Sequence, residues 1–303
     1  MSNSNIGFTG RFKLVASKAD GSGVRELTDW FDNLIVNSGL DSLGAGVNHM
    51  NQCNVGSGSS VPVATNTALD SSYAQSTDRT GEAGASTAAP WYKWLRFKFR
   101  FPVGVAAGNI SEIGVFSSGV LWSRTLVKDA QGNTTTITVL SDEVLDVYYE
   151  LRIFPPENDV VANFTLNGTQ HTATLRASNA SSVGWASDFT SGITGTQNQN
   201  VQLGNGTDLG PVTGTFGAAT STQVVTLAYY DLSWYTYIQN SMQRRVRLTM
   251  GLDRANFSGG IGGANLHLNY GDFQVKFDPP IPKTNQMVLR LDFMLSWARR
   301  NIV

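Results

Sequence analysis

The stretch LRFKFRF at residues 95–101 decides the fold, because large apolar side chains alternate there with cations. The stretch LDVYYELRI at residues 145–153 alternates in the same way, and two prolines follow soon after it. Successive side chains of a β-strand point to opposite faces of a sheet, so a period of two indicates one buried and one solvated face. Each stretch is therefore predicted to be a half-buried strand.

The same period recurs towards the end of the sequence, at residues 273–277 and 287–297. Helical signals are few: residues 37–44 carry Asn37 or Ser38 as a cap and Gly44 as a stop, and residues 67–73 fit one further helical turn. The sequence therefore predicts an all-β protein with few short helices. Weaker strand patterns cover residues 8–14, 113–121, 135–140, 224–237 and 246–250.

The composition of the sequence argues against nucleic acid and anionic membranes as partners. The 303 residues contain 22 Lys plus Arg and 23 Asp plus Glu, so the net charge of −1 provides no field that would attract nucleic acid or an anionic membrane. Cys53 is the single cysteine, which excludes an intrachain disulfide and fits assembly in a reducing cytoplasm. No run of about 18 apolar residues occurs, so no membrane-spanning segment is expected. Partners are expected to be held by short-range packing and hydrogen bonds.

Three regions are predicted. Residues 1–156 form a β-sandwich assembly domain, residues 157–265 an inserted β-rich domain, and residues 266–303 C-terminal strands that pair back onto the first domain. Within the first region, residues 54–89 are dominated by Gly, Ser, Thr, Ala and Asn. Such a composition buries little apolar surface, so this segment is predicted to be a loop with one small helix that orders on assembly.

No pattern indicates catalysis, a cofactor or a metal. His49, His171 and His267 have no spacing typical of metal ligands, and the serines at residues 56–60 lack the context of a nucleophile or of a phosphate-binding loop. The chain is therefore not expected to be an enzyme. A polysaccharide hydrolase is the alternative that the sequence leaves open, because its two carboxylates can come from distant strands. The acidic residues considered for that role are Asp188, Asp208 and Asp231.

Aromatic residues and arginines indicate contact surfaces instead. Adjacent aromatic residues on one strand face both sides of a sheet, so one set is surplus to the core and is typical of protein interfaces or of sugar stacking. The basic cluster at residues 244–247 alternates with apolar residues, which fits a solvated strand face or an ion-paired contact with a neighbouring subunit. The predicted interface residues are Trp91, Tyr92, Trp94, Tyr235, Tyr237, Arg244, Arg245 and Arg247.

Three phrases resemble virion proteins of tailed bacteriophages, especially tail, baseplate and fibre-attachment proteins. The first is WFDNLIVNSGLD at residues 30–41. The second is CNVGSGSS at residues 53–60, followed by NTAL at residues 66–69. The third is GNISEIGVF at residues 108–116, with LWSRTLVKD at residues 121–129 and the segment 139–152. Within the third phrase, Glu112 and Arg124 are expected to pair and to tie neighbouring strands together.

The resemblance implies a particle-bound, homo-oligomeric β-sandwich module without catalysis. The expected function is that of a structural component of a phage tail, baseplate or collar, assembled in the host cytoplasm and docking other virion proteins or fibres. Residues 157–265 carry no such phrase, so a fibre protein that binds a host-surface glycan through this domain is the alternative.

Overall fold

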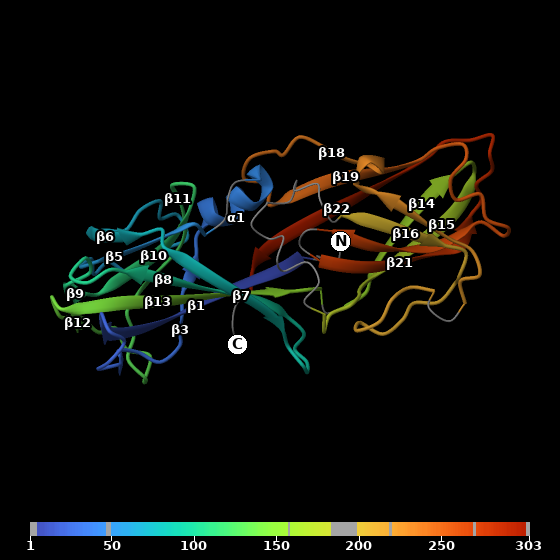
Figure 1. The fold of residues 1–303 in the computed structure, drawn as a ribbon. Coiled ribbons are helices and arrows are strands. Elements are labelled where there is room, and N and C mark those ends of the chain that lie inside the picture. Colours follow the sequence, from blue (N-terminus) through green and yellow to red (C-terminus); the bar gives the residue numbers. More distant parts are fainter. Residues whose placement is uncertain are drawn as a thin grey trace.

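The structure is a computed structural model that describes residues 5–46, 50–156, 158–182, 199–217, 220–268 and 271–300. Strands account for 54% and helix for 4%, which confirms the predicted all-β fold with few short helices. Figure 1 shows two lobes, one coloured blue to green and the other mainly yellow to red. Each lobe is a β-sandwich, and one long sheet contributes to both.

The long sheet has nine strands and runs through both lobes. Its strands β8 and β13 contain the two alternating stretches from which the fold was predicted, and their apolar residues are buried while most of the intervening ones are not. In order of pairing the strands are β18 (Leu232–Trp234), β19 (Gln243–Met250), β22 (Leu289–Arg299), β1 (Asn5–Lys18), β13 (Glu143–Phe154), β8 (Lys93–Phe101) and β7 (Arg79–Ala85), and β2 (Arg25–Glu26) and β3 (Phe31–Asp32) also pair with β1.

Two further sheets face the long one, and a strand pair lies at the edge of the first lobe (Figure 1). The five-stranded sheet of the first lobe has the order β4 (Leu34–Ile35), β11 (Val120–Leu126), β10 (Glu112–Ser117), β5 (Gln52–Gly56) and β6 (Ser72–Ser76). The strand pair is β12 (Ile137–Val139) with β9 (Gly108–Ile110). The six-stranded sheet of the second lobe has the order β14 (Val160–Leu166), β15 (Thr169–Ala177), β21 (Gly271–Ile281), β20 (Ile261–Leu268), β16 (Asn200–Gly204) and β17 (Val224–Ala228).

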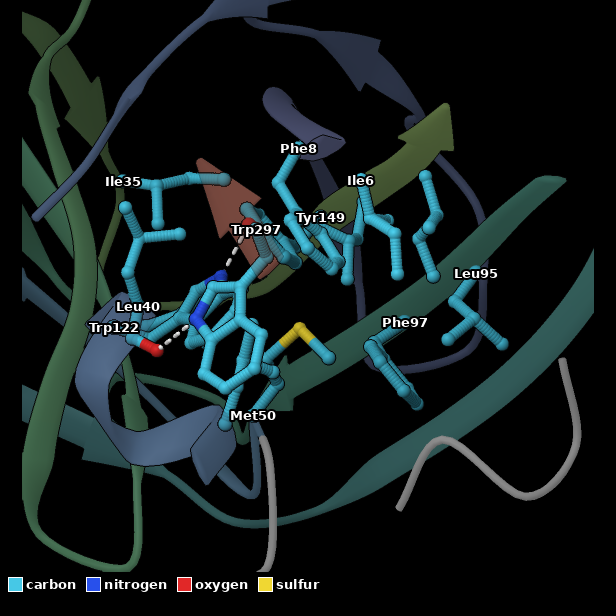
Figure 2. Packing of buried hydrophobic residues seen from close by; sticks show 14 of the residues in the cluster. Ile6, Phe8, Ile35, Leu40, Met50, Leu95, Phe97, Trp122, Tyr149 and Trp297 are labelled. Atoms are coloured by element: carbon cyan, nitrogen blue, oxygen red, sulfur yellow. Dashed lines mark hydrogen bonds between the residues drawn. The ribbon is translucent and has the colours of Figure 1, made fainter. Parts of the chain in front are cut away.

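The core of the first sandwich is closed around aromatic side chains. Trp122 on β11 meets Phe8 on β1 edge to face, and its indole N–H donates to the Tyr149 hydroxyl at 2.7 Å. Trp297 on β22 donates its indole N–H to the carbonyl of Leu40 at 2.8 Å. Both hydrogen bonds are drawn in Figure 2. The buried tryptophans therefore keep their polar atoms paired, as a dry core requires.

The second sandwich has unequal faces. In the second lobe the six-stranded sheet packs on the long sheet, whose strands there include β18, β19 and β22 (Figure 1). A sandwich core is filled where the inner faces of two sheets meet. Phe164, Leu166 and Leu175 of β14 and β15 remain only half-buried, and they line a hollow that β22 borders on its other side. This side of the second sandwich is therefore open.

The C-terminal strands lie in different sheets. β22 runs parallel to β1, with Asn5–Phe8 opposite Ser296–Arg299, and so reaches the first lobe. β21 pairs instead with β15 and β20 and belongs to the second lobe. The segment predicted as residues 266–303 is thus divided between two sheets, because alternation of side chains specifies a strand without specifying its neighbour.

The helix predicted at residues 37–44 is confirmed as α1, which spans Asn37–Ala45. The predicted caps are wrong. The N-cap is Val36, without a side-chain cap hydrogen bond, and the helix ends at Gly46, whose φ of 72° is left-handed. A glycine adopts this left-handed conformation at little cost, so the helix stops at Gly46 and not at the predicted Gly44. α1 packs on β11, where a Cβ on Gly39 would lie 2.2 Å from the carbonyl oxygen of Trp122.

The prediction of a loop at residues 54–89 is wrong in part. Its beginning belongs to β5, and two further strands, β6 and β7, lie within it. The helical turn predicted at residues 67–73 is also wrong, because those residues form bends that lead into β6. β6 gains its backbone hydrogen bonds from β5, and β7 gains them from β8, so pairing overrides the weak strand propensity of these small residues.

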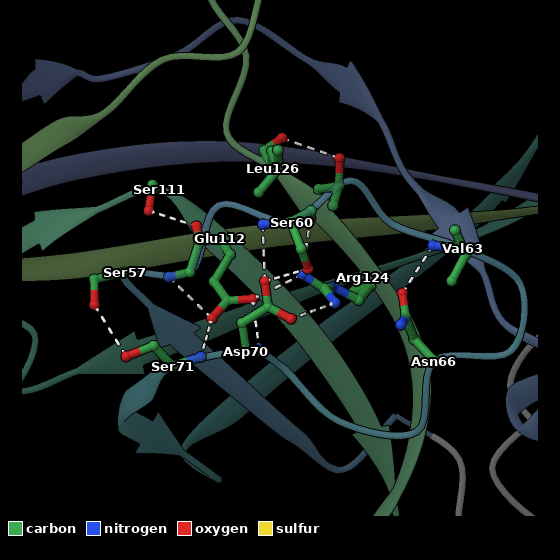
Figure 3. A network of polar contacts seen from close by, with 12 residues as sticks. Ser57, Ser60, Val63, Asn66, Asp70, Ser71, Ser111, Glu112, Arg124 and Leu126 are labelled. Carbon is green, nitrogen blue, oxygen red and sulfur yellow. Dashed lines mark hydrogen bonds and ion pairs between the residues drawn. The ribbon is translucent and has the colours of Figure 1, made fainter.

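The expected pairing of Glu112 with Arg124 is confirmed, at 3.0 Å with both side chains fully buried. Glu112 also accepts hydrogen bonds from the backbone N–H groups of Gly58, Asp70 and Ser71. Arg124 reaches Asp70 at 3.1 Å (Figure 3). The ion pair therefore holds the segment between β5 and β6 against the sheet within a single chain, and its order does not need an assembly partner.

The structure corrects or confirms several further strand predictions. The strand predicted at residues 224–237 is interrupted, because Tyr229–Asp231 form a single turn of 3₁₀ helix between β17 and β18. Residues 8–14 and 246–250 lie in β1 and β19, as predicted. None of the helical segments in the described ranges has the length and apolar character needed to cross a membrane.

Candidate interaction surface

Three arginines converge on one carboxylate on the outer face of the long sheet. Arg11 and Arg96 stand on either side of Glu150, because β1, β13 and β8 place these residues in one row. Arg11 donates to Glu150 at 2.9 Å, Arg96 at 2.7 Å and Arg152 at 2.8 Å. Burial alone would raise the pKa of Glu150, but the hydrogen bonds from Arg96 and Arg152 outweigh it and lower the pKa. Glu150 therefore stays ionised and fixes all three guanidinium groups.

Aromatic rings cover these arginines. The guanidinium carbon of Arg11 lies 4.5 Å from the ring centre of Trp30, and that of Arg96 lies 4.8 Å from the ring centre of Trp94. The guanidinium of Arg152 lies 4.8 Å from the ring centre of Tyr92. Such cation–π contacts contribute about 0.5–1 kcal/mol each at exposed sites. We call this surface the arginine–aromatic face, and it consists of Arg11, Trp30, Tyr92, Trp94, Arg96, Glu150 and Arg152.

The predicted residues Trp91, Tyr92 and Trp94 are half-buried, so each keeps part of its ring accessible. The ring of Trp94 lies over β7 at Gly84, where a Cβ would be 2.2 Å from Cζ2 of the indole. Glycine is needed at that position because any larger side chain would push the ring outwards. Gly84, one of the small residues of the 54–89 segment, thus leaves room for an aromatic ring.

The predicted residues of the second lobe are largely engaged within the chain. The guanidinium of Arg245 lies 3.6 Å from the ring centre of Tyr235. Arg247 donates to Asp292 at 2.7 and 3.0 Å, and these hydrogen bonds lower the pKa of Asp292. Arg244 donates to the carbonyl of Gly44 at 2.6 Å. The proposed contact of this cluster with a neighbouring subunit stays a prediction, and the ion pairs present are internal.

Tyr237 lies at the contact between the lobes. Its ring stacks on Trp297 with the centres 5.9 Å apart, and its hydroxyl donates to Asp41 of α1 at 2.7 Å. Burial, followed by the nearby Asp41, raises the pKa of Tyr237 to about 12. The residue therefore anchors α1 to β22, and this role was not foreseen from the sequence.

A second contact between the lobes was also missed. Lys93 of β8 forms an ion pair with Asp272 of β21 at 2.9 Å, and both side chains are about 5% exposed or less. The imidazole Nδ1 of His267 contacts the same carboxylate. Burial lowers the pKa of Lys93. Lys93 occupies a position of β8 whose alternate residues are apolar and buried. The one signal for an ion-pair partner in another sheet was that a lysine stands at the end of this apolar row.

The residues weighed for metal binding or hydrolysis are dispersed. His171 is buried, with its Nδ1 2.7 Å from the carbonyl oxygen of Pro279, and stacks on Phe164. The carboxylate of Asp231 accepts a backbone hydrogen bond from Ala228, and Asp208 contacts the Thr220 hydroxyl. His49 and Asp188 lie outside the described residues. Across the described ranges, no three His, Cys, Asp or Glu side chains come together as a metal site would require.

Comparisons with known proteins identify no relative. No protein-family model, no curated protein and no solved structure matches this chain.

Proposed function

We propose that the chain is a structural component of a tailed-phage virion, located in the tail, baseplate or collar. In this role it forms a homo-oligomer that docks neighbouring virion proteins or fibres. The proposal rests on the three phrases that resemble tail and baseplate proteins. The observation that carries it is that each of the three phrases, which together span residues 30–152, contributes to the five-stranded sheet or to α1, while the segment 139–152 falls mainly in β13 of the long sheet.

The phrase at residues 30–41 covers β3, β4 and the start of α1, and the phrases at residues 53–60 and 66–69 border β5 and β6. The phrases at residues 108–116 and 121–129 form β9, β10 and most of β11. They meet at the buried pair of Glu112 and Arg124, which fixes the segment between β5 and β6. A module that shares these phrases would share this rigid sheet, and a rigid sheet suits assembly into a particle.

Particle location tests the proposal directly. Particles purified from a culture that carries the gene should contain the chain in stoichiometric amount, and gold-labelled antibodies should mark the tail or collar in electron micrographs. Light scattering on the purified chain should give a mass several times that of the 32.7 kDa monomer. A monomeric chain that stays in the particle-free fraction would exclude the proposal.

A host-surface glycan receptor is the second candidate, and the arginine–aromatic face favours it. A hollow of about 290 Å³ adjoins this face and is lined by Thr80, Gly81, Glu82, Arg96, Lys98 and Tyr148. Half-buried rings beside cations suit an acidic sugar, because the ring stacks on its apolar face and the cations pair with its carboxylate. A glycan array probed with the full chain should then select acidic glycans, and Trp94→Ala should abolish the signal. A blank array removes this candidate and leaves the structural role untouched.

A further inference from the structure

A lysine and an aspartate from different lobes are buried together. Lys93 of β8 and Asp272 of β21 lie 179 residues apart in the sequence, and Nζ of Lys93 is 2.9 Å from Oδ2 of Asp272. The two side chains are 5% and 4% exposed. Little water therefore reaches either charge. A buried ion pair of this kind gains little over a neutral amine and a neutral acid, because the loss of hydration offsets the attraction between the charges.

Backbone pairing holds both residues in place. Lys93 stands opposite Ile153 of β13 on one side and opposite Ala85 of β7 on the other. Asp272 stands opposite His267 of β20. The amine and the carboxylate are thus kept side by side in the folded chain. Fixed placement of two reacting groups can raise their effective concentration to about 10⁵–10⁸ M.

A third titratable group contacts the same carboxylate. Nδ1 of His267 contacts Oδ1 of Asp272, whereas Nζ of Lys93 contacts Oδ2. A carboxylate oxygen accepts hydrogen bonds, so the imidazole presents an N–H to Oδ1. The side chain of His267 is 30% exposed, so its ring can exchange protons with solvent. The carboxylate therefore has an amine beside one oxygen and a proton donor beside the other.

We infer that Lys93 and Asp272 become joined by an isopeptide bond, an amide between their side chains. The first step is the transfer of a proton from the ammonium to the carboxylate, which leaves a neutral amine and a neutral acid. Burial lowers the pKa of Lys93 and so makes this transfer easier. The neutral amine has the lone pair that the reaction needs.

The bond changes balance without a further reactant. The lone pair of Nζ attacks Cγ of Asp272, and the new bond between carbon and nitrogen replaces the bond between Cγ and Oδ1. The imidazole of His267 delivers a proton to Oδ1, which leaves as water, and regains a proton from the attacking nitrogen. Overall the ammonium gives up two protons, both of which leave with one carboxylate oxygen. Oδ2 remains as the carbonyl oxygen of the amide.

The isopeptide bond links the two lobes covalently, because β8 and β21 belong to different sheets. Cys53 is the single cysteine, so a disulfide within the chain cannot provide such a link. An amide also persists in a reducing compartment, where disulfides do not. The inference goes beyond the proposed virion role and does not rest on it, because the bond concerns the chain alone.

A second lysine–aspartate pair provides an internal control. Lys18 also contacts Asp142, but these side chains are 39% and 65% exposed. Water stabilises both charges there, so this pair should stay ionic. The two pairs share the same functional groups and differ in burial. A link at Lys93 without a link at Lys18 would therefore show that burial, and not contact alone, produces the bond.

Mass spectrometry of the denatured full chain tests for the bond. We expect the mass to be lower than the sequence requires by one water molecule. Trypsin should then fail to cleave after Lys93 and should release residues 80–96 joined to residues 255–276. A full mass, together with a free peptide that ends at Lys93, would overturn the inference. This measurement uses the parent chain, so it decides the question whether or not any variant folds.

Three variants then assign the roles. Lys93→Arg keeps the cation but has no amine, so its mass should equal that of its sequence. Lys18→Arg should still lack one water. His267→Gln should slow the appearance of the bond about a hundredfold when the chain is made by cell-free synthesis and followed by mass. A water still lost from Lys93→Arg would overturn the assignment to this lysine, and an unchanged rate in His267→Gln would overturn the role of the imidazole.

Discussion

The two sandwiches share one sheet but differ in how completely they close. In the first, the inner faces of both sheets are covered, and even the charged side chains of Glu112 and Arg124 are fully buried. In the second, apolar residues such as Phe164 and Leu291 stay half-buried around a hollow between the two sheets. Both sandwiches use the same alternation of side chains. Alternation therefore creates an apolar face, but the packing of the opposing sheet decides whether that face is covered.

The largest effect is expected at the buried ion pair of the closed sandwich. Glu112→Gln leaves the buried Arg124 guanidinium with the part-exposed carboxylate of Asp70 as its remaining ion-pair partner, and should lower the free energy of unfolding by about 3–5 kcal/mol. Arg124→Met should cost less, because Glu112 keeps its three backbone N–H donors and a carboxylate can be protonated whereas a guanidinium cannot. Urea midpoints at constant slope measure both losses. Small and equal losses would contradict the view that the pair fixes the first sandwich.

A matched pair of leucines tests closure itself. Leu151 of β13 is fully buried in the first sandwich, whereas Leu291 of β22 borders the hollow between the sheets of the second. Leu151→Ala should lower the free energy of unfolding by about 2–5 kcal/mol, because a cavity remains in a packed core. Leu291→Ala should cost roughly 1 kcal/mol, because little packed contact is lost beside that hollow. Equal losses in urea unfolding would show that the second sandwich is as closed as the first.

Acid should affect the first sandwich more than the second. Hydrogen bonds from Ser60 and Arg124 lower the pKa of Asp70 from 3.8 to about 2, and those from Arg25 lower the pKa of Glu143 from 4.5 to about 2. The folded carboxylates bind protons less tightly than the unfolded ones, so their contribution is complete above about pH 4.5 and is lost as the pH falls towards about 2. Urea midpoints measured over this range should fall with pH.

Arg25→Gln is the control for this pH dependence. It removes the guanidinium that holds Glu143, so the pKa of Glu143 should return towards its ordinary value. The fall of stability below about pH 4.5 should then be shallower than in the parent chain. A fall of unchanged steepness would mean that Glu143 does not contribute to it.

The smallest effect is expected at the exposed cluster of the second lobe. Arg245→Gln removes a cation that is 45% exposed and lies 3.7 Å from Asp292. Exposed ion pairs contribute about 0–1 kcal/mol, and Arg247 continues to hold Asp292. The urea midpoint should therefore change little, and raised salt should reduce even that difference. A loss as large as that of Glu112→Gln would show that the cluster is structural after all.

The sequence predicted the strands that carry large apolar residues and missed those that do not. LRFKFRF at residues 95–101 predicts β8 because one face of the strand is apolar and the other is cationic. β7, with the sequence RTGEAGA, has no such contrast and is a strand only because β8 pairs with it. Its glycines provide room for the aromatic rings of the neighbouring strand. That requirement is set by tertiary contacts, which propensity does not contain.

The sequence predicted which aromatic residues lie on the arginine–aromatic face, but not which residues they contact there. Tyr92 and Trp94 were named from the surplus of aromatic residues, whereas their arginine partners depend on the register of β1, β13 and β8. The pairing of Glu112 with Arg124 was found because a tight hairpin brings the two residues close in sequence as well as in space. Lys93 and Asp272 are 179 residues apart and come from different sheets, so no local pattern could join them.

The short parallel ladder between β1 and β22 has a mechanical consequence. Asn5–Phe8 and Ser296–Arg299 overlap end to end, with the rest of β1 in one lobe and the rest of β22 in the other. A pull that separates the lobes along these strands would load all the hydrogen bonds of the overlap at once, in shear, instead of opening them one after another. The overlap of β1 and β22 should therefore resist a force along the strands far better than a force that separates the strands sideways, one hydrogen bond after another.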